Sequence, residues 1–182
     1  MTTASSKEDW GKAVSMFDKR MMRFTEPIRI LMETPDTEAA IYSGFSIIAL
    51  DCLLIETLQS FRTGRTNPLK GDGKSKDTIT NFLTQRNNFA KHFNASAADI
   101  FYNHFRCGIL HQGEVKSSGL IRIDTANMVL PSDDGQSLII NRWYFHEAIL
   151  EEIKEYKEEL MIGLDLALRE HFIKKMNEIS RP

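Results

Sequence analysis

The segment from Thr37 to Arg62 constrains the fold most, because it reads as a long helix that is apolar on almost every side. Apolar residues recur at spacings of three and four along one stripe, and other apolar residues widen that stripe around the axis. The two sets are Ile41, Phe45, Ile48, Cys52, Ile55 and Leu58, then Ile47, Leu50, Leu53, Leu54 and Phe61. Such a helix is stable in water only when neighbouring elements cover most of its surface. We therefore expect it at the centre of a helical bundle, with Thr37 as its N-cap.

Two carboxylates interrupt this apolar segment, Asp51 and Glu56. A carboxylate inside a protein core needs a partner, because burial without one is costly. The pattern leaves two alternatives open. In the first, one or both carboxylates reach solvent at an edge of the helix. In the second, one of them binds Arg106, which lies further along the chain.

Amphipathic patterns predict the helices that cover the central one. The first is expected over residues 6–33, with a kink or a new turn at Pro27. A further helix begins within residues 76–78. The next one starts at Ser96, the first residue of a capping box, and ends close to Gly113.

Beyond Gly113 the periodicity changes to short apolar runs between residues 120 and 140, around the turn sequence Pro-Ser-Asp-Asp-Gly. This pattern predicts a small β-hairpin. Asn141 then caps the last and longest helix, whose apolar positions continue to Phe172. The expected fold is mainly all-α: a single domain over residues 1–182, built as an antiparallel bundle of four to five helices with a small β-hairpin inserted before the long last helix.

Composition narrows the choice of partners and compartment. The net charge of −2 gives no global basic field, so any nucleic-acid binding must rest on a local patch. The two cysteines, Cys52 and Cys107, both lie in apolar helical segments, which favours free thiols in a reducing compartment. The N-terminal residues lack the apolar region of a signal peptide, and the longest apolar run is too short to span a membrane. We expect a cytoplasmic protein without a membrane partner.

A polar, turn-rich stretch follows the central helix over residues 62–77 and carries a local charge of 5 − 2 = +3. Its charged residues are Arg62, Arg65, Lys70, Lys74 and Lys76 against Asp72 and Asp77. The sequence Gly-Lys-Ser at 73–75 is similar to the end of a phosphate-binding P-loop, but Pro68 stands where the first glycine is required and a helix precedes the loop instead of a strand. These departures exclude a nucleotide triphosphatase. The stretch is either a solvated loop or a surface that contacts RNA phosphates.

The helix that ends near Gly113 is rich in aromatic residues and carries several side chains that could take part in catalysis. Arg106 and His111 lie close to its end, and His104, Tyr102 and Asn103 add polar groups one or two turns earlier. At about 100° per residue, Arg106 and His111 are roughly 140° apart around an α-helix, whereas His104 shares the face of His111. The gap can close if the arginine wraps around the helix, or if the helix tightens or ends at His111. Otherwise a second chain completes the site at a symmetric dimer interface.

The sequence Arg-Cys-Gly-Ile-Leu-His at 106–111 resembles the Arg-x4-His signature of the HEPN superfamily. This resemblance implies a four- or five-helix bundle that often dimerises. Many members are metal-independent endoribonucleases of toxin–antitoxin, abortive-infection and CRISPR-linked defence systems, and others are non-catalytic modules that bind RNA or proteins. The family often has asparagine, aspartate or histidine directly after the arginine, where this chain has Cys107.

The resemblance implies that Arg106 and His111 are catalytic, at a cleft between two copies of the chain. RNA supplies its own nucleophile, the 2′-hydroxyl, so cleavage needs only proton transfer and a fixed cation at the phosphate. His111 suits the first task and Arg106 the second. We expect no cofactor, and the spacing of His, Cys, Asp and Glu suggests no metal site.

Two alternatives stay open at the level of sequence. In the first, the protein is an endoribonuclease that acts as a homodimer, as a toxin or defence effector with an antitoxin as its protein partner. In the second, it is a non-catalytic helical module that binds RNA or a protein partner. A structural role for the motif is also possible, in which Arg106 pairs with Asp51 or Glu56 and His111 only caps the helix.

Overall fold

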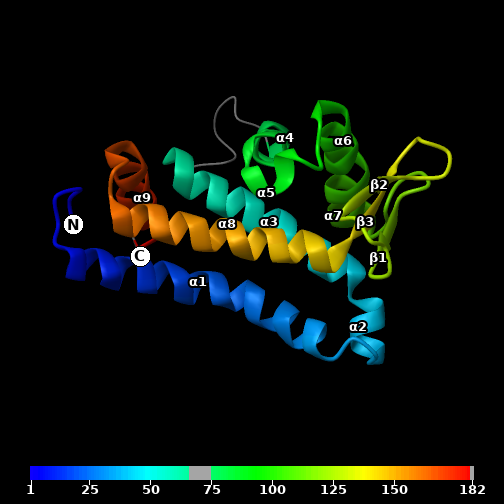
Figure 1. The fold of residues 1–182 in the computed structure, drawn as a ribbon, viewed down its shortest axis with the longest axis horizontal. Helices are drawn as coiled ribbons and strands as arrows, with labels where there is room; N and C mark the ends of the chain where they lie inside the picture. Colours follow the sequence, from blue (N-terminus) through cyan, green and yellow to red (C-terminus); the bar gives the residue numbers. More distant parts are fainter. Residues whose placement is uncertain (66–74, 181–182) are drawn as a thin grey trace.

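The computed structural model describes residues 1–65 and 75–180, and its fold is mainly all-α, as the sequence predicts (Figure 1). A small three-stranded sheet lies at one end of the helical part. In chain order the elements are α1 (Lys7–Glu33), α2 (Glu38–Tyr42), α3 (Gly44–Thr63), α4 (Ser75–Gln85), α5 (Asn87–Ala90), α6 (Ala95–Ile100), the π-helix η1 (Phe101–Arg106), α7 (Cys107–Gln112), β1 (Leu120–Arg122), β2 (Val129–Pro131), β3 (Leu138–Asn141), α8 (Arg142–Ile162) and α9 (Leu166–Ile179).

Helix α3 is the central helix, and it contacts α1, α4, α8 and α9. Many of its apolar side chains are completely buried, among them Ile47, Leu54 and Phe61. By length and composition alone α3 could cross a membrane, but 56% of its most apolar window is buried inside the protein, which is the environment of a core helix. The apolar pattern in this part of the sequence is therefore explained by the helices that cover α3.

The segment expected as one helix from Thr37 to Arg62 is divided at Ser43, which ends α2 before α3 begins. Gly44 lies so close to the sheet side of the molecule that a Cβ atom there would be 3.1 Å from both Arg142 and Ile121. The chain changes direction here, between the end of α2 and the start of α3. Thr37 caps α2 as predicted, accepting a hydrogen bond from the Ala40 amide at 3.2 Å.

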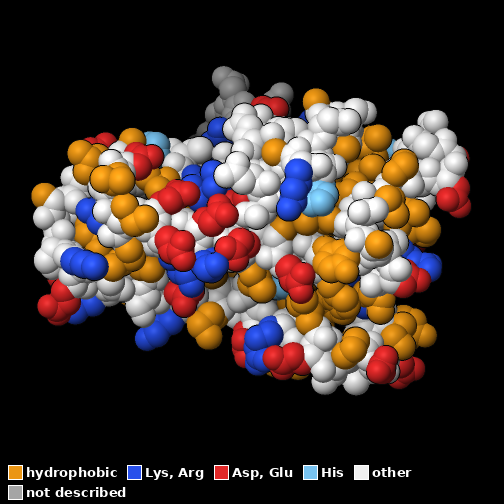
Figure 2. Space-filling view, viewed as in Figure 1, with side chains coloured by type: hydrophobic (Ala, Val, Ile, Leu, Met, Phe, Trp, Pro, Cys, Tyr) orange, Lys and Arg blue, Asp and Glu red, His pale blue; other side chains and the backbone are white. Residues whose placement is uncertain are grey.

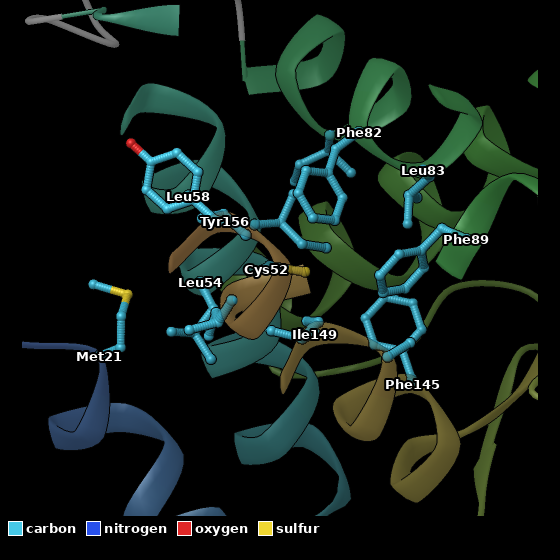
Figure 3. Packing of buried hydrophobic residues seen from close by; sticks show 14 of the residues in the cluster. Met21, Cys52, Leu54, Leu58, Phe82, Leu83, Phe89, Phe145, Ile149 and Tyr156 are labelled. Carbon is cyan, nitrogen blue, oxygen red and sulfur yellow. The ribbon is translucent and has the colours of Figure 1, made fainter. Parts of the chain in front are cut away.

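Aromatic rings fill much of the core around α3. Phe82, Phe89 and Phe145 lie in one line of contacts, with ring centroids 5.5 Å and 5.1 Å apart (Figure 3). Phe145 also stacks on Phe101 of η1, with centroids 5.0 Å apart. Phe101 is one of the residues that fix η1 against the core.

The sheet contains the predicted hairpin and one further strand. β2 and β3 pair antiparallel around the turn at residues 131–135, and β1 adds to the other side of β3 in parallel, giving the order β1-β3-β2. Asn141 ends β3 and caps α8 as expected, accepting from the amides of Trp143 and Tyr144.

Two predicted helix boundaries are wrong, and the helix over residues 6–33 is continuous at Pro27. The cap of the fourth predicted helix is Asn94, which accepts from the Ala97 amide at 2.8 Å, and not Ser96. The long last helix is two helices, because Gly163 adopts a left-handed φ of 73° and ends α8. α1 continues through Pro27 to Glu33 as a single helix of 27 residues.

Candidate functional site

The backbone of η1 decides where Arg106 points. This segment is a π-helix, in which the Cys107 amide bonds to the Tyr102 carbonyl five residues earlier. Phe101 and Phe105 of η1 are buried, and η1 packs against α3 and α4. Arg106, at the end of η1, reaches Glu56 of α3.

Arg106 is the centre of the site. Its Nη2 atom donates to Glu56 Oε1 at 3.1 Å, and its Nη1 atom lies 3.4 Å from Nε2 of His111. The guanidinium carbon is 5.7 Å from the centre of the Tyr102 ring. The arginine side chain is 16% exposed, whereas His111 is exposed. One chain therefore brings a permanent cation, a carboxylate and a solvent-accessible imidazole to the same place.

The contact between Arg106 and His111 forms within one chain, although an ideal α-helix separates them by about 140°. Of the ways in which the gap could close, the structure shows the arginine side chain spanning it. The helix also ends beside the histidine, since the Gly113 amide is shared between the carbonyls of Gly108 and Ile109 and Gly113 has a left-handed φ of 66°.

Glu56 is held from a second side by Ser75, the first residue of α4, whose hydroxyl donates to Glu56 Oε1. The Tyr102 hydroxyl interacts with Ser75 and with the Cys107 thiol. Burial raises the pKa of Tyr102, so the phenol is protonated at neutral pH. Sequence reasoning missed Ser75, because its contact with Glu56 depends on where α4 begins and not on the Gly-Lys-Ser sequence around it.

Of the two carboxylates in the central helix, Glu56 is the partner of Arg106. Asp51 lies elsewhere, completely buried, with its Oδ1 atom 2.7 Å from Nδ1 of His146 on α8. Sequence reasoning also missed His146, which lies in the apolar face of α8 and has no local signal beyond that position.

His104 and Asn103 do not join the site. Nδ1 of His104 lies 3.1 Å from the hydroxyl of Ser137 beside the sheet, and the amide of Asn103 donates to Asp99 at 2.9 Å. The supporting role that the sequence predicts for His104 and Asn103 is not seen in these contacts, because each side chain binds a residue outside the Arg106–His111 pair.

The basic stretch that begins at the end of α3 contributes less free charge than its sequence suggests. Arg62 is bound to Glu159 at 2.7 Å and its side chain is only 9% exposed. Arg65 donates to Thr78 at 3.0 Å, and Lys76 forms an ion pair with Asp99. Lys70 and Lys74 lie outside the described residues. No group of three or more potential metal ligands of the types His, Cys, Asp and Glu is found in residues 1–65 and 75–180.

Comparisons of this chain with models of known protein families, with curated proteins and with solved structures find no match. The function must therefore be inferred from the geometry of the site.

Proposed function

We propose that this protein is a metal-independent endoribonuclease of HEPN type, with Arg106 and His111 acting on the scissile phosphate. The observation that carries the proposal is the contact of 3.4 Å between Arg106 Nη1 and the exposed His111 imidazole. A purely structural arginine needs Glu56 but has no need of a second, solvent-accessible group at the same guanidinium. A nuclease needs both, because RNA cleavage requires proton transfer next to a fixed positive charge.

In the proposed reaction the 2′-hydroxyl of the RNA attacks the adjacent phosphorus, and the bond from phosphorus to the 5′-oxygen breaks. His111 takes the proton of the 2′-hydroxyl or gives one to the leaving 5′-oxygen, since an imidazole can do either near neutral pH. Arg106 stabilises the charge that builds on the non-bridging oxygens. Glu56 holds the guanidinium in place through its contact of 3.1 Å.

One histidine does not supply both an acid and a base, so we propose that two chains meet at their His111 residues as a homodimer. Large apolar side chains on or beside α2, α3, α7 and β1 are between 38% and 79% exposed, which supports an interaction surface in this region. They are Ile41, Tyr42, Phe45, Leu110, Leu120 and Ile123. Figure 2 shows hydrophobic side chains gathered at the end of the molecule that carries the sheet and α2.

The experiment is cleavage of single-stranded RNA in the presence of EDTA. We expect His111→Ala to lower the rate constant by about 10²–10⁴-fold and Arg106→Ala by about 10²–10³-fold. His92→Ala is the matched control, because His92 is a partly exposed histidine outside the site. RNA with a 2′-deoxy sugar at the cleaved position should resist cleavage. Activity that survives both Arg106→Ala and His111→Ala would contradict the mechanism.

The alternative is a non-catalytic HEPN-like module that binds RNA or a protein partner such as an antitoxin. The specific observation in its favour is that the cation of Arg106 is already paired with Glu56, next to Cys107 in place of the family's polar residue. This alternative predicts RNA or protein binding without any cleavage product. The same assay, read together with RNA affinity, separates the two functions.

A further inference from the structure

A groove of about 320 Å³ lies between α1, α3 and α9 and reaches the candidate site at Glu56. Phe24, Leu53 and Ile179 form its apolar wall, whereas Arg20 and Lys175 supply two cations. Leu53 is 41% exposed in spite of its place on the central helix. The groove is therefore the part of α3 that the other helices leave open next to Glu56.

The charges of the groove favour an anionic occupant. Arg20 makes no ion pair or side-chain hydrogen bond within residues 1–65 and 75–180. Lys175 is paired with Glu178 at 2.6 Å, and Glu56 is paired with Arg106 at 3.1 Å. The guanidinium of Arg20 is consequently the one uncompensated charge among these groups, on a partly buried side chain that lines the groove.

The walls favour an occupant with a flat apolar part. Phe24 is half-buried against the core, so its ring is fixed and still borders the groove. Proteins that bind single-stranded nucleic acid combine such a fixed aromatic ring, on which a base stacks, with cations that follow the backbone. Arg20 and Phe24 are four residues apart on α1 and therefore lie on the same side of this helix.

We propose that this groove binds the nucleotide next to the scissile phosphate of a single-stranded RNA. The phosphate of that nucleotide contacts Arg20, and its base lies against Phe24 and Leu53. The inference rests on the proposed nuclease function. Glu56 lines the groove and also binds Arg106, so an RNA strand bound at the Arg106–His111 site would continue into the groove. It adds a substrate subsite that the resemblance of residues 106–111 does not imply.

Binding of a single-stranded RNA with 2′-O-methyl sugars tests the proposal, because this RNA cannot be cleaved by its own 2′-oxygen. We expect Arg20→Ala to weaken binding and to lower the slope of log K against log salt concentration by about 0.7, the value for one lost phosphate contact on a single strand. Phe24→Leu keeps an apolar side chain of similar size but loses the flat ring, and we expect it to weaken binding about tenfold. Arg23→Ala is the matched control, because Arg23 is an exposed arginine on the same helix that does not line the groove.

Equal effects of Arg20→Ala and Arg23→Ala would overturn the proposal, since they would show binding by surface charge in general. An unchanged salt slope in Arg20→Ala, or no binding by the wild-type protein, would also overturn it. Cleavage assays on His111→Ala distinguish a failure of the nuclease proposal from a failure of the groove proposal. If His111→Ala abolishes cleavage but Arg20→Ala binds normally, the nuclease stands and the groove proposal fails. If RNA binding depends on Arg20 but no RNA is cleaved, the nuclease proposal fails and RNA binding in the groove is retained.

Discussion

Asp51 and His146 face one another at the centre of the bundle, with 2.7 Å between Oδ1 and Nδ1 and no exposed surface on either side chain. Asp51 belongs to α3 and His146 to α8, so this contact joins two central helices. The remaining polar atoms, Asp51 Oδ2 and His146 Nε2, are buried without a hydrogen-bond partner in the described part of the chain. An ionised carboxylate at this position therefore receives only part of the stabilisation that water would give it.

The pair predicts a specific dependence of stability on pH. Burial raises the pKa of Asp51, and the hydrogen bond with His146 offsets only part of that effect. Since the pKa is higher in the folded state than in the unfolded state, the contribution of Asp51 to stability is greatest below the unfolded value of about 3.9 and is lost as pH rises through the folded pKa. We expect Asp51→Asn, which cannot ionise, to lose less stability than the wild-type protein when pH rises from about 4 to neutral.

Urea unfolding followed by circular dichroism, repeated across this pH range, checks the prediction. Asp36→Asn is the control, because Asp36 is exposed in the connection between α1 and α2. The quantity to compare is the difference in free energy of unfolding between each variant and the wild-type protein. A difference for Asp51→Asn that is independent of pH would contradict the assignment.

Replacing the pair with apolar residues tests the cost of its burial. His146→Leu leaves Asp51 without its partner, and we expect the free energy of unfolding to fall by about 3–5 kcal/mol. The double variant Asp51→Leu with His146→Leu removes both polar groups from an apolar site, so we expect it to regain most of that loss. A double variant as unstable as the sum of the two single variants would show that the residues do not act as a pair.

The position of α3 could be predicted from the sequence, because an all-round apolar helix has few other places in a soluble fold. The pairing of its two carboxylates could not be predicted. Asp51 and Glu56 are five residues apart and therefore face different neighbours, and the choice between them depends on how α8 and η1 pack against α3. The histidine that binds Asp51 lies 95 residues away in the chain, beyond the reach of any local pattern.

The candidate site could be located but not assembled from the sequence. The residues Arg106 and His111 carry the signal, and the structure brings them into contact. The contact of His104 with Ser137 could not be predicted, because spacing arguments assume 3.6 residues per turn, whereas η1 has the wider turn of a π-helix. The break between α8 and α9 was missed because apolar spacing continues on both sides of it. Gly163 ends α8 with a left-handed φ, and Asp165 then caps α9.

Arg62 provides a prediction that separates stability from RNA binding. Its guanidinium binds Glu159 and lies 4.8 Å from the centre of the Tyr156 ring, so this residue serves the core instead of an RNA phosphate. We expect Arg62→Ala to lower the free energy of unfolding by about 1.5–3 kcal/mol and to leave RNA affinity unchanged. Lys76→Ala, which removes an exposed ion pair with Asp99, should change stability little. A loss of RNA affinity in Arg62→Ala protein that is still folded would show that Arg62 contacts RNA and would contradict the prediction.

Two glycines with the same backbone conformation predict different costs of substitution. Gly113 and Gly163 have φ values of 66° and 73°, but a Cβ atom at Gly113 would meet nothing within 4 Å, whereas one at Gly163 would lie 2.3 Å from the guanidinium carbon of Arg169. Arg169 closes the end of α8 by donating to the Leu160 carbonyl at 3.0 Å and 2.8 Å.

Gly113→Ala should therefore cost only the left-handed conformation, about 1–2 kcal/mol in the free energy of unfolding. Gly163→Ala should cost this amount and, in addition, about 1–3 kcal/mol for displacing Arg169 from the carbonyl that it satisfies. Thermal and urea unfolding of the two variants measure the difference directly. Equal losses would show that Arg169 moves aside freely, and its contacts with the end of α8 would then contribute little to the stability of the fold.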